Sequence, residues 1–99
     1  MNKPVTVIIT CTIKPGMMDI AIKELKASIQ TVLREEKACH GIKVHNTPEH
    51  PQILLIIEQW ENKEIFLGPH MQTPHMKTFL KTAETFLEGA AEFNFWYET

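Results

Sequence analysis

Glu58 and Trp60 stand two residues apart at the end of an apolar run, and their types suit proton transfer and the binding of a flat ligand. Residues two apart in a β-strand point to the same face, so both side chains are expected to meet one environment. A carboxyl group beside Leu54 and Ile56 is expected to have a raised pKa and can then serve as a base. The alternative is an ordinary pairing of Glu58 with a nearby lysine or backbone N–H.

Trp60 and His70 could act on a ligand together. An indole ring can stack on a flat compound, and its N–H can donate to an oxygen atom. Trp60 could equally be a core residue that ends the strand. His70 follows Gly68-Pro69, which predicts a loop in which an imidazole can face a pocket and titrate near neutral pH. The alternative for His70 is an exposed side chain without a role.

His75 is expected in the first turn of a helix. Thr73 is a suitable N-cap, and Pro74 suits the first helical position. The positive end of the helix dipole favours a neutral imidazole there, and a neutral imidazole can act as a base or as a hydrogen-bond donor. Local packing or capping would explain His75 equally well.

Motif spacing and charge argue against several other kinds of site. His70 and His75 are five residues apart and the chain has no H-E-x-x-H motif and no paired C-x-x-C motif, so we expect no metal site. The formal net charge of -2 favours neither nucleic acid nor a membrane as a partner. Cys11 and Cys39 form no disulfide framework, and threonines interrupt the apolar run near the N-terminus, so we expect a cytoplasmic protein.

The elements that must position these side chains follow from the spacing of apolar residues. Two prolines predict a loop over 46–51. The whole pattern predicts an α+β, ferredoxin-like fold, in which an antiparallel sheet carries helices on one face, as a single domain spanning 1–99. In chain order we expect a strand over 5–13, a helix over 18–37, strands over 42–45 and 52–61, a short helix over 62–67, a helix from Thr73-Pro74 to Gly89, and a strand over 93–97.

The third predicted strand is apolar on both of its faces. It contains the run Ile53 to Ile57, and its second face is joined by Ile8 from the first strand and Trp96 from the last. Helices can cover only one face of the sheet, and soluble monomers avoid large exposed apolar patches. We therefore expect a homodimer in which two sheets pack face to face. The alternative is that long side chains of neighbouring strands cover this face.

Three short segments together resemble the antibiotic biosynthesis monooxygenase (ABM) family of dimeric α+β barrels. They are Lys14-Pro15-Gly16 after the first strand, Glu58-Gln59-Trp60 at the end of the third, and the segment from His70 to His75. The resemblance implies that two four-stranded sheets form a barrel across the dimer, with a pocket between sheet and helices in each subunit. It also implies one of several activities: cofactor-free oxygenation of anthrones and quinols, haem degradation, or isomerisation of a phosphorylated sugar.

The haem-degrading branch of the family uses an asparagine on the first strand, a tryptophan ending the third, and a histidine ten residues later. Trp60 and His70 match two of these positions. The first predicted strand, 5–13, contains no asparagine. This departure favours a reaction without a cofactor over haem degradation.

The sequence thus favours a cofactor-independent monooxygenase that uses molecular oxygen on a small aromatic, quinol or anthrone-like substrate. His70 or His75 would take the substrate proton, and Trp60 would hold the ring and donate to the oxyanion, while the substrate-binding residues would be Glu58, Phe66 and Phe79. Two alternatives are an isomerase or proton-transfer enzyme for a small, phosphorylated or unphosphorylated metabolite, and a non-enzymatic module that binds a small ligand.

Overall fold

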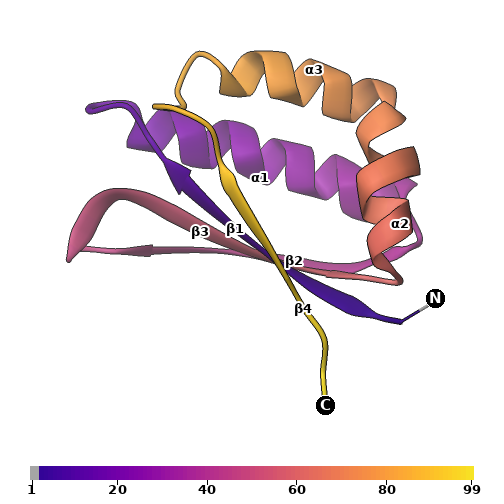
Figure 1. Cartoon of the computed structure of the whole chain (residues 1–99). Coiled ribbons are helices and arrows are strands. Elements are labelled where there is room, and N and C mark those ends of the chain that lie inside the picture. The colour runs from indigo at the N-terminus through magenta and orange to yellow at the C-terminus, as the bar shows by residue number, and fades with distance from the viewer. Residues whose placement is uncertain (1–2) are drawn as a thin grey trace.

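The computed structural model describes residues 3–99 as one antiparallel sheet with a layer of helices on one face (Figure 1). This arrangement confirms the α+β, ferredoxin-like fold expected from the sequence. The strands are β1 (Val5–Thr12), β2 (Cys39–Thr47), β3 (His50–Trp60) and β4 (Glu92–Trp96), and the helices are α1 (Met18–Glu35), α2 (Lys63–Ile65), the π-helical turn η1 (Phe66–His70) and α3 (Pro74–Ala83).

The sheet has the strand order β2-β3-β1-β4, so β1 and β3 occupy its centre. Buried and half-buried residues alternate along β1, as its pattern of β-branched residues predicts. The β1–β3 register pairs Val7 with Glu58 and Val5 with Trp60. Glu58 and Trp60 therefore lie on the same face as the buried β1 residues, which is the face under the helices.

The β2–β3 hairpin is longer than predicted, and the prediction of a loop over the whole of 46–51 is wrong. Thr47 pairs with His50, so only Pro48 and Glu49 form the turn. Pro51 is tolerated inside β3 because pairing of β3 with β1 begins only at Ile53. A register shift between Asn46 and Thr47 accommodates the irregular end of the hairpin.

The two long helices also end earlier than predicted. Helix α1 ends at Glu35, and Glu36 is an extended C-cap whose N–H donates to the Val32 carbonyl. Helix α3 ends at Ala83, and the segment that follows is held by turns such as the bond from Phe86 N–H to the Ala83 carbonyl. For α3 the difference arises because Phe86 and Leu87 continue the apolar periodicity beyond the last regular turn.

The connection between β3 and α3 is helical where a stop was expected. Asn62 caps α2, as predicted, because its side chain accepts a 2.8 Å hydrogen bond from the Ile65 N–H. The chain does not stop at Gly68-Pro69 but continues through η1. The wider π-helical turn accommodates Pro69 without breaking the helix. His70 is consequently the last residue of a helical turn, and the prediction that it lies in a loop is wrong.

In the part of the chain that the structure describes, no helix lies on the second face of the sheet (Figure 1). Ile8, Leu55 and Ile57 on this face are only half-buried, and Trp96 is 61% exposed. The expected apolar second face is therefore present in the single chain. Among residues 3–99, no helix has the length and apolar character that crossing a bilayer requires.

Candidate active site

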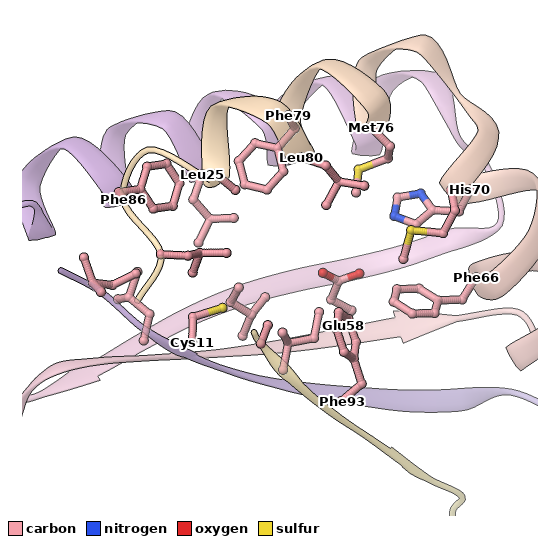
Figure 2. A pocket seen from close by; sticks show the side chains of 18 residues that line it. Cys11, Leu25, Glu58, Phe66, His70, Met76, Phe79, Leu80, Phe86 and Phe93 are labelled. Carbon is pink, nitrogen blue, oxygen red and sulfur yellow. The ribbon is translucent and has the colours of Figure 1, made fainter. Parts of the chain in front are cut away.

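A cavity of about 100 Å³ lies between the inner face of the sheet and the helices (Figure 2). Its volume is of the same order as that of apolar cavities known to bind a small aromatic molecule. Of the described residues that line it, only Cys11, Glu58 and His70 carry a titratable group. The lining is otherwise apolar and includes Ile9, Leu54, Phe66, Met76, Phe79, Phe86 and Phe93.

Glu58 is the one carboxylate among the described lining residues, and it is 8% exposed. Its Oε1 atom accepts a 2.7 Å hydrogen bond from the Trp60 indole N–H. Burial raises the pKa of the Glu58 carboxyl to about 7, the Trp60 hydrogen bond opposes this, and the Glu36 charge adds to it. A carboxyl group with a pKa near neutrality can exchange protons with a ligand at physiological pH.

Trp60 lies behind the cavity wall and does not line it. Its side chain is completely buried, with its ring edge-on to Phe66 at 5.6 Å and 4.3 Å from the His70 ring. Its only indole donor is bonded to Glu58. The expectation that Trp60 stacks on the ligand and donates to its oxygen is therefore revised, because neither its ring face nor its N–H reaches the cavity. Trp60 instead holds the Glu58 carboxyl by a hydrogen bond and packs against the His70 ring from outside the cavity.

His70 reaches the cavity from η1 and is 2% exposed. Its ring stacks on Phe66 with centroids 5.3 Å apart, and Figure 2 shows it at the same end of the cavity as the Glu58 carboxyl. Its Nδ1 atom lies 2.9 Å and 3.0 Å from the two carboxylate oxygens of Glu36. Burial lowers the pKa of His70, while the Glu36 carboxylate opposes this shift. The lowered pKa favours the neutral imidazole.

His75 is in the first turn of α3, as predicted, and Thr73 caps this helix by accepting from the Met76 N–H at 3.2 Å. The His75 side chain does not line the cavity. It borders a groove between α1 and α3, and its Nε2 atom lies 2.6 Å from Glu36 Oε2. The expectation that His75 could take the substrate proton is thus revised, because α3 turns its side chain toward α1 and away from the cavity.

The sequence matches the model of the antibiotic biosynthesis monooxygenase family over residues 4–82. The chain belongs to this family. A curated relative from Escherichia coli K12, named "Probable quinol monooxygenase YgiN", is 33% identical over 84 residues that cover 75% of this chain and 79% of the relative. The solved structure of PA3566 from Pseudomonas aeruginosa has a TM-score of 0.84 and 27% identity, covering 100% of this chain and 97% of that one. A conserved protein from Methanosarcina mazei has a TM-score of 0.86 at 22% identity, covering 99% and 95%.

Three of the site residues expected for this ABM-family chain lie on the cavity wall as substrate-binding candidates: Glu58, Phe66 and Phe79. His70 lines the cavity as well, whereas Trp60 and His75 lie behind it. Among residues 3–99, no group of three His, Cys, Asp or Glu side chains has an arrangement that could hold a metal ion.

Glu36 is the functional candidate that sequence reasoning missed. It lies in the polar run Arg34-Glu35-Glu36-Lys37, which has the composition of any solvated helix end. Its carboxylate contacts residues 34 and 39 positions further along the chain. No local pattern could have indicated these contacts.

Trp60→Phe is expected to raise the pKa of Glu58 above about 7, because the indole N–H favours the ionised carboxyl. The loss of a buried donor is also expected to lower the free energy of unfolding by about 1–3 kcal/mol. A ¹³C NMR titration of the Glu58 carboxyl and urea denaturation measure the two effects. Trp96→Phe is the matched control for the pKa measurement, because Trp96 lies on the opposite face of the sheet from Glu58. A Glu58 pKa that is the same in both variants would contradict the supporting role of Trp60.

Proposed function

We propose that this ABM-family protein is a cofactor-independent monooxygenase that uses molecular oxygen on a small aromatic, quinol or anthrone-like compound. The observation that carries the proposal is Glu58, a carboxyl group with a pKa of about 7 in a cavity that is otherwise almost entirely apolar. The name of the Escherichia coli relative supports a quinol as the substrate class.

The overall reaction balances without an external reductant. For an anthrone-like methylene, CH₂ and O₂ give a carbonyl and water: one oxygen atom bonds to carbon and the other leaves with both hydrogens. For a quinol, one oxygen atom becomes a ring hydroxyl and the other leaves as water with the two hydrogens lost as the ring becomes a quinone. In both cases the substrate supplies all four electrons that O₂ accepts.

The protein must make the substrate electron-rich and keep water away. The Glu58 carboxylate would take a hydroxyl or methylene proton, and the resulting anion would transfer an electron to O₂. Its position at one end of an apolar cavity would let Glu58 return the proton to the departing oxygen atom. His70 would accept a hydrogen bond from a second hydroxyl, while Phe66 and Phe79 would flank the ring and exclude water.

Oxygen consumption by the purified protein with a panel of hydroquinones and anthrones tests this proposal. With ¹⁸O₂ and no added reductant, we expect one labelled oxygen atom per product molecule. The matching quinones and methyl ethers, which have no acidic hydroxyl, should give no consumption. Binding without oxygen uptake would instead support a non-enzymatic module, and rearranged product without label would support an isomerase.

A phosphorylated substrate has less support. Phosphate sites usually supply arginine, lysine or clustered backbone N–H groups. No lysine or arginine of residues 3–99 lines the cavity, and the Glu58 carboxylate would repel a phosphate when charged. The geometry therefore favours an uncharged aromatic compound over a sugar phosphate.

We also propose that the second face of the sheet pairs with a second copy of the chain. Ile8, Leu55, Ile57 and Trp96 would then be buried between two sheets. Ile57→Lys is expected to dissociate the dimer at micromolar concentration, because a lysine at the centre of the interface loses its hydration. Sedimentation velocity measures the change, with Thr78→Lys on the exposed side of α3 as the control. A wild-type protein that sediments as a single 11.4 kDa species would refute the dimer.

A further inference from the structure

Glu36 joins the two histidines of this region through one carboxylate. Its oxygens lie 2.9 Å and 3.0 Å from Nδ1 of His70, and Oε2 lies 2.6 Å from Nε2 of His75. The side-chain exposures are 12% for Glu36, 3% for His70 and 21% for His75. The cluster therefore extends from the buried cavity, through a nearly buried carboxylate, to the groove between α1 and α3.

The position of Glu36 follows from the way α1 ends. Glu36 leaves the helix in an extended conformation at the C-cap, so its side chain no longer follows the exposed face of α1. Its neighbour Glu35 remains in the last turn, is 54% exposed at the side chain and contacts Arg34. Two adjacent glutamates thus have opposite environments, and only Glu36 is directed at η1 and α3.

The protons in this cluster follow from the chemistry of its groups. An ionised carboxylate only accepts hydrogen bonds, so His70 must donate through Nδ1 and His75 through Nε2. A neutral imidazole carries one N–H, and burial favours the neutral form of His70 by lowering its pKa. The remaining ring nitrogen of His70, Nε2, is then an acceptor.

We infer that Glu36 is a positioning residue that holds His70 in its Nδ1–H tautomer, so that Nε2 presents an acceptor to the cavity. His75 holds the carboxylate from the opposite side and limits its rotation. This inference rests on the proposed function for its catalytic consequence, because a substrate hydroxyl is what Nε2 would accept from. The tautomer itself is a property of the ligand-free protein.

Long-range ¹H–¹⁵N NMR spectra of the native protein read the tautomer directly. We expect the His70 signals of a protonated Nδ1 and an unprotonated Nε2 at pH 8. In Glu36→Gln, the amide offers one acceptor and one donor group to two histidines, so His70 should become a mixture of both tautomers. Glu35→Gln is the matched control, and its His70 signals should equal those of the native protein.

Ligand binding without oxygen provides a second measurement. Under anaerobic conditions, Glu36→Gln should bind a small hydroquinone about tenfold more weakly, which is the effect of losing one well-formed hydrogen bond. It should bind the hydroquinone dimethyl ether as tightly as the native protein does, because the ether has no proton to donate. Glu35→Gln should match the native protein for both ligands.

The outcomes separate this inference from the proposed function. An Nε2-protonated His70 in the native protein overturns the inference, as does a Glu36→Gln variant whose His70 tautomer is unchanged. If Glu36→Gln does not fold, the native NMR signals decide the question. If the native protein consumes no oxygen while His70 is in the Nδ1–H form, the monooxygenase proposal fails and the positioning role of Glu36 stands.

Discussion

Glu58→Gln is expected to lower the rate of substrate oxygenation by about 10²–10⁴-fold, the usual effect of removing a positioned base. Glutamine has nearly the same shape and can still accept the hydrogen bond from Trp60, so the cavity should keep its form. Stopped-flow measurement of oxygen consumption with saturating hydroquinone gives the rate. Ligand affinity should change much less than the rate, since the apolar wall is retained. A variant that retains most of the native rate would exclude Glu58 as the base.

The pH profile of the native protein provides a second test of Glu58. Its pKa of about 7 means that the carboxylate needed for proton abstraction forms as pH rises. The catalytic rate should increase about tenfold per pH unit below pH 7 and level off above it. The control is the Glu58→Gln variant, in which this step near pH 7 should be absent. A native rate that falls as pH rises through 7 would mean that the protonated form of Glu58 is the active one.

The same carboxyl group predicts a pH dependence of stability. Its pKa is raised on folding from 4.5 to about 7, so the native state holds this proton while the unfolded chain releases it. The contribution of Glu58 to the free energy of unfolding is therefore largest below pH 4.5 and falls by about 3 kcal/mol as pH rises to 7. The difference in stability between Glu58→Gln and the native protein isolates this contribution. An equal pH dependence in both would show that the pKa of Glu58 is not raised.

His70 and His75 are expected to differ sharply in their effect on the rate. His70→Ala should lower the rate by about 10²-fold, because it removes the acceptor in the cavity. His75→Ala should lower it by less than about tenfold, because His75 only supports Glu36 from the groove side. Steady-state kinetics at pH 8 with one hydroquinone compares the two. If His75→Ala lowers the rate more than His70→Ala does, the assignment of the cavity-side role to His70 is wrong.

A second His70 variant controls for loss of packing. His70→Ala leaves a hole beside Phe66 and an unpaired Glu36 carboxylate, and both can destabilise the fold. His70→Asn retains a donor close to the position of Nδ1 and removes Nε2. It should preserve the contact with Glu36 and the stability of the protein, yet lose nearly as much activity as His70→Ala.

Much of the fold is determined by local patterns in the sequence. Alternation in β1 places Val7 and its neighbours inward, and the spacing of Glu58 and Trp60 puts both on that same face, because strand geometry has a period of two. The caps at Asn62 and Thr73 also follow from residue type, since each needs only a side chain within three residues. The raised pKa of Glu58 follows from the same pattern, which buries a carboxyl among apolar strand residues.

Only the tertiary structure determined which side chains of the site contact one another. The packing of η1 against β3 decides whether the Trp60 side chain reaches the cavity. The sequence could not indicate that His70 and Phe66 cover the indole ring. Glu36 and His70 are 34 residues apart, so their contact arises from the way two helix ends come together above the sheet. Such contacts depend on where elements end and how they pack, which neither periodicity nor residue type encodes locally.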